Sequence, residues 1–406
     1  MIKIIKRVFE LESATGVLLL IAASLALFVA NSPLLTYYQN IFSLAIPLEL
    51  KTLGISKNMS LLDWINDFLM AIFFLMVGSE LKQELTIGTL SSKHQAMLPI
   101  IGAVGGIILP ATIFYFFNQH QPNYLAGFAV PIATDIAFAY GVVSFFGKII
   151  CQSLKVFLIS LAIFDDLVAI VIIALFYTQN LNLSFLLLAF LPLFCLFILS
   201  RFYHLSKKIL VALYLFFGFF LWLTILKSGV HATIAGVILA MCIPKQHLAR
   251  IIHTIAPTVN FFILPVFIFA NSGVVLPHIS FSLLSDNLFS GIFFGLFLGK
   301  QLGVMLFCFV AIKLNIVSLP KYYNANHQLI AVSWWQFYIV AIITGIGFTM
   351  SIFIGNLAFA NHDLQLLDTT KIAVLFASLF SVFLAITLYQ LTTLNANSMI
   401  FCKKKV

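Results

Sequence analysis

The chain has 406 residues, of which 62% are hydrophobic and only 9% are charged, and its formal net charge is +9. A soluble domain carries about 25% charged residues, so this chain has too little charge to coat a surface that faces water. The composition excludes a soluble enzyme, a disordered protein and a single-span receptor with a large external domain. It predicts an all-α polytopic membrane protein whose main partner is the lipid bilayer.

Twelve apolar runs approach the length of about 20 residues that a helix needs to cross a bilayer. Lys3, Lys6 and Arg7 precede the first run as in a signal peptide, but the many later runs favour a retained first helix. No linker separates the runs, so we expect a single transmembrane transporter domain over 1–406. The predicted spans are 13–30, 62–82, 96–117, 124–146, 154–177, 183–200, 208–223, 227–243, 251–276, 288–312, 329–358 and 370–394.

The basic residues lie between the apolar runs and form no single patch, which argues against nucleic acid as a partner. If the N-terminus is cytoplasmic, 17 Lys and Arg fall on the cytoplasmic side and 4 on the outer side. This bias predicts that both termini are cytoplasmic. We expect an N-terminal surface helix at 1–12 and a cytoplasmic basic tail at 395–406.

The long outer loop at 31–60 contains a weak strand pattern. Leu48, Leu50 and Leu53 alternate with other residues, and Gly54 suits a turn, so a small β-hairpin is predicted there. The five cysteines of the chain show no paired spacing. We therefore expect no disulfide framework, metal cluster or cofactor.

Most of the 13 acidic residues lie at span ends or in loops, but Asp135, Asp165 and Asp166 stand within apolar runs, as does Lys300. Each charge at mid-membrane costs about 2.5–3.5 kcal/mol on insertion scales, so such residues mark ion or proton pathways. One Lys cannot neutralise three carboxylates, although a purely structural ion pair is the alternative. Adjacent Asp165 and Asp166 repel each other in a low dielectric, so a proton and a cation can compete for them.

Two segments interrupt the helical pattern. In the first, Pro131 removes a helical hydrogen bond just before Thr134 and Asp135, which predicts a broken helix lining a cavity, with an ordinary proline kink as the alternative. The second, TGIGFTMSIFIG at 344–355, has two glycines and polar side chains that can satisfy freed backbone groups. These breaks fall in spans 4 and 11, the middle members of two three-span units, as in transporters with inverted repeats.

Seven segments, in order along nearly the whole chain, make the sequence resemble the NhaA-type Na+/H+ antiporter family, which is also a standard example of inverted repeats. They are WINDFLMAIFFLMVGSELKQEL (64–85), PIATDIAFAYG (131–141), AIFDDLVAIVIIALFYT (162–178), LKSGVHATIAGVI (226–238), LPVFIFANSGV (264–274), LGKQLGV (298–304) and GIGFTMSIFI (345–354). The resemblance implies secondary active, electrogenic exchange of internal Na+ or Li+ for external protons by alternating access. It implies a homodimer in the bacterial inner membrane, with the outer hairpin as a contact, and a role in sodium and pH homeostasis.

The resemblance also implies residue roles. Asp166 matches the indispensable Na+ ligand, and Asp165 matches a second ligand that pairs with Lys300 until Na+ binds. Asp135 and Thr134 match the broken-helix positions, where Asp135 offsets positive helix ends and Lys300 negative ones.

A pH-sensing set is implied at Glu80, Lys82, Glu84, His231 and His253. The alternatives are a solvated helix end for the first three residues and a structural hydrogen-bonded side chain for His231. Gln83 stands where the family has Arg, and Ile252 where an acid is expected. The resemblance therefore predicts an altered pH response.

Three other functions compete with antiport. A Na+-coupled symporter of an organic anion needs donors for that anion, and the Asp pair with an intramembrane Lys favours exchange. An intramembrane aspartyl protease carries a G-x-G-D motif, but Phe348 follows Gly345-Ile346-Gly347 here. A channel does not need acids that exchange protons near neutral pH. The sequence thus predicts a transporter and not an enzyme.

Overall fold

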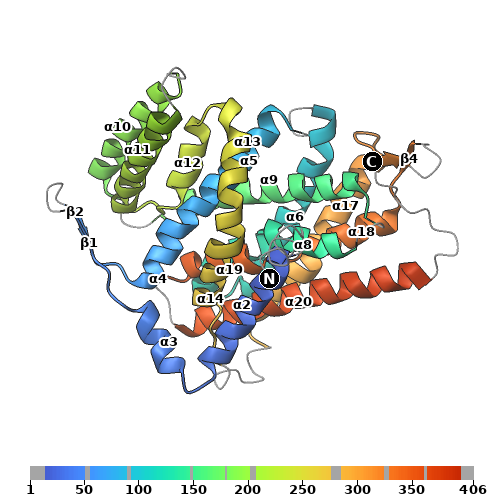
Figure 1. Cartoon of the computed structure of the whole chain (residues 1–406). Helices are drawn as coiled ribbons and strands as arrows, with labels where there is room; N and C mark the ends of the chain where they lie inside the picture. Colours follow the sequence, from blue (N-terminus) through green and yellow to red (C-terminus); the bar gives the residue numbers. More distant parts are fainter. Residues whose placement is uncertain are drawn as a thin grey trace, which may run out of the picture. The chain divides into compact units, whose positions relative to one another are not determined.

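A computed structural model describes residues 14–50, 55–88, 93–146, 150–178, 181–201, 207–275, 285–323, 329–360 and 364–394. The predicted surface helix at 1–12, the basic tail at 395–406 and the turn containing Gly54 lie outside the described residues. The described chain is helical, with two short antiparallel hairpins (Figure 1). Helices satisfy their own backbone hydrogen bonds, which the hydrocarbon core of a bilayer requires.

Eight described helices are long and apolar enough to cross a membrane, or up to ten if each of two bent helix pairs is one span. The bent pairs are Ala14–Ala30 with Leu35–Phe42, at 115°, and Pro122–Ile132 with Ile136–Phe145, at 44°. A shorter apolar helix covers Leu183–Leu199. These helices confirm a polytopic helical membrane protein.

The predicted span at 227–243 differs most from expectation. Its helix, α12 (Ile234–Cys242), has only nine residues. The preceding helix, α11 (Lys207–Ser228), ends just before Gly229, which has φ of 84°. Glycine adopts this left-handed conformation at little cost, so it ends the helix and the chain turns before α12 begins.

Contacts divide the chain into two compact units, and the first comprises the described parts of 14–21, 88–169 and 274–394. Helices α2 (Ala14–Ala30) and α9 (Gln152–Phe176) have residues in both units. The other elements of the first unit are α6 (Lys93–Asn118), α7 (Pro122–Leu125), the 3-10 helix η4 (Ala126–Ile132), α8 (Ile136–Phe145), α16 (Asn287–Phe294), the π-helix η7 (Gly295–Lys300), α17 (Gln301–Lys313), β3 (Lys321–Tyr323), β4 (Leu329–Ala331), α18 (Trp334–Ile343), α19 (Phe348–Ala358) and α20 (Leu364–Leu394).

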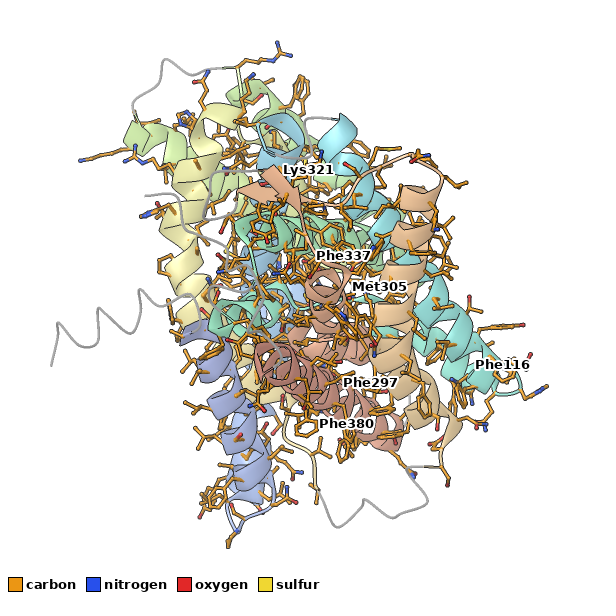
Figure 2. All side chains as sticks on the ribbon, turned by 90° about the vertical axis from the view of Figure 1, so that its right-hand side faces the viewer. Phe116, Phe297, Met305, Lys321, Phe337 and Phe380 are labelled. Carbon is orange, nitrogen blue, oxygen red and sulfur yellow. The ribbon has the colours of Figure 1, made fainter. Side chains whose placement is uncertain are left out.

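In the first unit, α6 and α17 approach each other through glycines. A Cβ atom added to Gly105 would collide with the backbone of Gly303, and the reverse also holds. Small residues allow such backbone contact between membrane helices. Aromatic side chains fill other interfaces of this unit: Phe297 and Phe380 lie with ring centroids 6.0 Å apart, while Phe116 points outward with 71% of its surface exposed (Figure 2).

The hairpin of the first unit was not predicted from the sequence. Strands β3 and β4 pair antiparallel, with Tyr322 opposite Ile330. Strand β3 lies between two predicted spans, whereas β4 takes up the first three residues of the predicted span 329–358. Each strand has only three residues, too few for a recognisable alternation.

The second unit comprises the described parts of 22–87 and 170–273. Its elements are α3 (Leu35–Phe42), β1 (Leu48–Leu50), β2 (Ile55–Lys57), α4 (Leu61–Asp63), the π-helix η2 (Trp64–Leu69), α5 (Met70–Thr86), α10 (Leu183–Leu199), α11, α12, α13 (Lys245–Thr258), the π-helix η5 (Val259–Ile263) and α14 (Leu264–Asn271). The helix α3 was not predicted.

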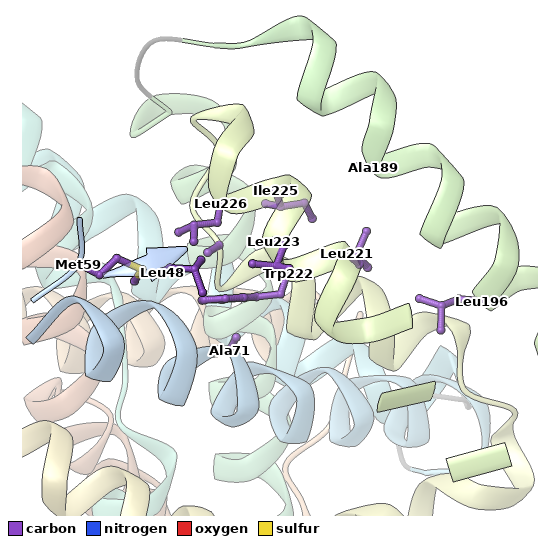
Figure 3. Close-up of a cluster of buried hydrophobic side chains, with 12 residues drawn as sticks. Leu48, Met59, Ala71, Ala189, Leu196, Leu221, Trp222, Leu223, Ile225 and Leu226 are labelled. Carbon is purple, nitrogen blue, oxygen red and sulfur yellow. The ribbon is translucent and has the colours of Figure 1, made fainter. Parts of the chain in front are cut away.

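The hairpin predicted within the loop 31–60 is confirmed as β1 paired with β2, in antiparallel register with Leu48 opposite Lys57. Leu48 and Met59 belong to a cluster of buried hydrophobic side chains around Trp222 (Figure 3). The Trp222 indole Nε1–H also donates a hydrogen bond of 3.2 Å to the carbonyl of Asp67. The hairpin is thus fixed to the second unit by apolar packing.

Helices α5 and α12 of the second unit also meet at glycines. A Cβ on Gly78 would lie 2.9 Å from the Cβ of Ala240, and a Cβ on Gly236 would collide with the carbonyl of Ala71. The nine-residue α12 is therefore held by close backbone packing along its length.

Candidate functional site

The first broken segment places Asp135 at the start of a helix. Residues 133–135 separate η4 from α8, and Asp135 is the N-cap of α8 with φ of −81° and ψ of 100°. Its carboxylate accepts a 2.9 Å hydrogen bond from the backbone N–H of Phe138. A capping carboxylate satisfies one of the free N–H groups at a helix N-terminus and balances the positive end of its dipole.

Asp135 also accepts hydrogen bonds at the N-terminus of a second helix. Residues 344–347 separate α18 from α19, and the second residue of α19 is Thr349. The backbone N–H of Thr349 donates to the Asp135 carboxylate at 2.9 Å, and its hydroxyl donates to the same oxygen. Asp135 is only 2% exposed. One buried carboxylate therefore balances the N-termini of both α8 and α19.

The two interruptions also contact each other through the backbone. The Asp135 N–H donates to the carbonyl of Ile346 at 2.8 Å, and the Ser351 hydroxyl donates to the carbonyl of Val130 at 2.7 Å. Phe348 has φ of 20°, an unusual value for a residue other than glycine. Its N–H donates to the Ser378 hydroxyl of α20 at 3.3 Å. Backbone groups that the breaks release thus find partners within the same unit.

Thr134 connects the broken segments to the Asp pair. Its hydroxyl lies 2.8 Å from Oδ2 of Asp165 and 2.9 Å from the carbonyl of Thr344, at the C-terminal end of α18. Both oxygens are acceptors when Asp165 is ionised, so the single hydroxyl proton serves one of them at a time. The negative end of α18 is thereby contacted by Thr134.

Asp165 and Lys300 form a fully buried ion pair. Lys300 Nζ donates to Oδ2 of Asp165, and both side chains are 0% exposed. Lys300 is the last residue of the π-helix η7, whereas Asp165 lies within α9. The other oxygen of Asp165, Oδ1, is buried and accepts no hydrogen bond from the part of the chain that the structure describes.

Asp166 follows on the same helix and is 1% exposed. Successive helix positions differ by about 100°, so the two carboxylates leave the helix in different directions. Asp166 is close enough to Lys300 for their charges to interact. The structure therefore brings Asp135, Thr134, Asp165, Asp166 and Lys300 into one buried charged region of the first unit, which we call the carboxylate site.

The candidate pH-sensing residues lie in the second unit. Lys82 Nζ donates to the carbonyl of Met241 at 2.7 Å and to that of Ile243, at the C-terminal end of α12. Glu80 and Glu84 lie on the same helix and are partly buried. Lys82 is thus a side-chain cap for α12, a role that its sequence context did not indicate.

The two histidines have different surroundings. A ring nitrogen of His231 lies 2.8 Å from the carbonyl of Tyr177, and the side chain is partly buried. His253 is exposed on α13. Hydrogen bonding of this kind is the structural alternative considered for His231, whereas His253 faces the surroundings of the protein.

Several polar residues near the carboxylate site were not singled out as site residues. Thr349 and Ser351 were noted only as groups that satisfy the backbone, and Gln301, Tyr338 and Ser378 were not assigned a role. Gln301 follows Lys300 within an apolar span, and a polar side chain at such a position is a signal in the sequence. The Ser378 contact joins residues 30 positions apart, which no local pattern reports.

Comparison with known proteins adds an independent result. The model of the family "Na+/H+ antiporter 1" matches residues 6–389. The Na(+)/H(+) antiporter NhaA of Shewanella amazonensis is 44% identical over 388 residues, which cover 93% of this chain and 95% of the relative. The NhaA protein of Nitratiruptor sp. is 47% identical over 380 residues, covering 91% and 94%. That of Pelagibacter ubique is 44% identical over 380 residues, covering 92% and 93%.

These matches extend over nearly the whole chain and include the segments that hold the carboxylate site. Each of these relatives carries the name of a transporter and not of an enzyme. The chain belongs to the NhaA family of Na+/H+ antiporters.

Proposed function

We propose that Asp165 and Asp166 form the site at which this antiporter exchanges Na+ for protons. Carboxylate oxygens suit hard cations, and the same oxygens bind protons, so one site can hold the two ions alternately. The observation that carries the proposal is the arrangement at Asp165. Lys300 and Thr134 both engage Oδ2, while buried Oδ1 has no donor among the described residues.

Na+ and Lys300 compete for Asp165, and this competition couples the binding of Na+ to the loss of the ion pair. Na+ and the Lys300 ammonium are both cations, so Na+ bound between Asp165 and Asp166 weakens the ion pair with Lys300. When Na+ leaves, the carboxylates are neutralised by Lys300 and by protons. Burial strengthens this competition because charges interact more strongly where water is excluded.

Asp135 and Thr134 support this site without being the principal Na+ ligands. The carboxylate of Asp135 is engaged by Phe138 and Thr349, so its charge is balanced by two helix N-termini. Thr134 has its hydroxyl within hydrogen-bond distance of Asp165 and can follow a change in the protonation of that carboxylate. The two broken segments therefore hold the site and respond to its charge.

The wider cycle follows from the family resemblance. We infer twelve spans with inverted repeats, in one transporter domain with both termini cytoplasmic, in the bacterial inner membrane. Internal Na+ or Li+ leaves in electrogenic exchange for external protons by alternating access. We further infer a homodimer that uses the β1–β2 hairpin, and pH regulation that involves Glu80, Lys82, Glu84, His231 and His253.

Proteoliposomes that hold a pH gradient test the site. Na+, Li+ and K+ are added in turn to the wild type and to Asp166→Asn while a fluorescent probe reports the gradient. We expect Na+ and Li+, but not K+, to collapse the gradient in the wild type, and neither to act on the variant. Asp286→Asn is the control, because Asp286 is a partly exposed N-cap of α16 and Asn also caps helices.

Two outcomes contradict the proposal. Exchange retained by Asp166→Asn in correctly inserted protein removes Asp166 from the site. A wild type that responds to Na+ only when an organic anion is added indicates symport.

A further inference from the structure

Gln301 is a neutral amide buried beside Lys300, and both ends of the amide are engaged. The side chain is 2% exposed and stands within the apolar span Asn287–Lys313. Its Nε2 donates to the carbonyl of Phe297, four residues earlier, and its Oε1 accepts a 2.8 Å hydrogen bond from the Tyr338 hydroxyl. A buried amide is retained at such a position only when its hydrogen bonds are made.

The first of these bonds acts on the π-helical turn that ends at Lys300. The π-helix η7 covers Gly295–Lys300, and Phe297 lies inside it. A π-helical turn contains more residues than an α-helical turn, so it changes the direction of every later side chain. The Gln301 side chain bonds a carbonyl within this turn. It thereby stabilises the turn that directs Lys300 toward Asp165.

The second bond connects the same turn to the second broken segment. Tyr338 lies on α18, the helix that ends at Ile343 just before the break. The carbonyl of Thr344 follows and lies 2.9 Å from the Thr134 hydroxyl. Four hydrogen bonds therefore connect Lys300 with Asp165, Asp165 with Thr134, Thr134 with Thr344, and Tyr338 with Gln301. The backbone of α18 links Tyr338 to Thr344, and Gln301 directly follows Lys300 in the chain.

We propose that Gln301 and Tyr338 are a positioning pair, which holds Lys300 against Asp165 and so sets how strongly Lys300 competes with Na+. This inference rests on the proposed exchange site at Asp165 and Asp166. In this proposal the pair acts on Lys300 and not directly on the transported ion. Breaking the pair leaves the carboxylates in place but loosens the ammonium that opposes Na+.

The test is Tyr338→Phe, which removes one hydroxyl and keeps the ring, together with Gln301→Met and the double variant. Transport is measured in proteoliposomes at alkaline pH, with the KM for Na+ and the maximal rate determined separately. We expect the KM for Na+ to fall by about threefold to tenfold, the range that loss of one buried hydrogen bond produces. The maximal rate per inserted protein stays within about twofold.

The double variant should match the larger single effect, because both substitutions break the same hydrogen bond. Tyr214→Phe is the matched control, since its hydroxyl lies 3.5 Å from the Cys242 carbonyl in the second unit. We expect an unchanged KM in this control. Monodisperse elution and the melting temperature verify that each variant is folded.

An unchanged or raised KM in folded Tyr338→Phe overturns the inference, as does a double variant whose effects multiply. Including Asp166→Asn in the same series separates the two claims. If Asp166→Asn still exchanges ions, the exchange site itself is wrong. If Asp166→Asn is inactive and Tyr338→Phe behaves like the wild type, only the positioning pair is wrong.

Discussion

The carboxylate site of the first unit and the side chains of Lys57 and Lys82 in the second unit differ in how deeply their charges are buried. In the first unit, Asp135, Asp165 and Lys300 are at most 2% exposed, and each has a partner from a distant part of the sequence. In the second unit, Lys82 caps carbonyls at a helix end, and Lys57 lies 3.8 Å from a carboxylate oxygen of Asp67 in a partly exposed pair. Charges that are buried this deeply depend on every partner, whereas charges near water do not.

The largest expected effect comes from Lys300→Ala in the first unit. Removing one member of a buried ion pair costs about 3–5 kcal/mol, because the other charge stays buried without compensation. We expect a marked fall in melting temperature in detergent and a changed pH profile of exchange. An unchanged melting temperature together with an unchanged profile would contradict the pairing with Asp165.

Asp135→Ala should have the next largest effect. It leaves the N–H groups of Phe138 and Thr349 without the carboxylate that caps both helices, and hydrogen bonds to a charged group contribute about 1.5–3 kcal/mol. We expect lower stability and slower exchange. Asp135→Asn should restore part of the stability because the amide oxygen still caps, and equal losses in both variants would refute the capping role.

Lys82→Met in the second unit tests the contrast between deeply buried and partly exposed charges. The Met side chain keeps most of the apolar stem but cannot donate to the carbonyls of Met241 and Ile243. We expect a loss of about 0.5–1.5 kcal/mol, since water replaces part of the interaction at this partly exposed position. Thermal unfolding of the purified protein measures it. A loss of stability as large as that of Lys300→Ala would contradict the difference between the charges of the two units.

Lys57→Gln should have the smallest effect. A partly exposed ion pair contributes about 0–1 kcal/mol and is screened by salt. The hairpin should therefore remain fixed by Leu48 and its apolar neighbours. Unfolding measured at low and high salt checks this, and a large loss that salt does not reduce would show that the Lys57–Asp67 pair anchors the hairpin.

Much of this organisation follows from local features of the sequence. The apolar runs predicted a polytopic helical protein, Pro131 marked the first interruption, and isolated charges in apolar runs marked Asp135, Asp165, Asp166 and Lys300. Each of these signals is contained in a window of about 20 residues or fewer, the length over which hydropathy is informative.

The features that the sequence did not reveal depend on contacts with residues outside any local window of sequence. The cap that Lys82 gives to α12 joins residues 159 positions apart, and the bond from Tyr338 to Gln301 joins residues 37 positions apart. The π-helical turn at 295–300 lies inside an apolar run, where hydropathy does not distinguish it from an α-helical turn. Tertiary contacts decide such features, so hydropathy and periodicity did not reveal them.

The backbone contact between Gly105 and Gly303 also determines how close Lys300 lies to α6. The two helices meet there without intervening side chains, so any residue larger than glycine at either position would push them apart. Lys300 lies less than one turn before Gly303, and a Cβ atom on Gly106 of α6 would lie 3.5 Å from its Cδ. A substitution that separates α6 from α17 would therefore also displace Lys300, and with it the ammonium that pairs with Asp165.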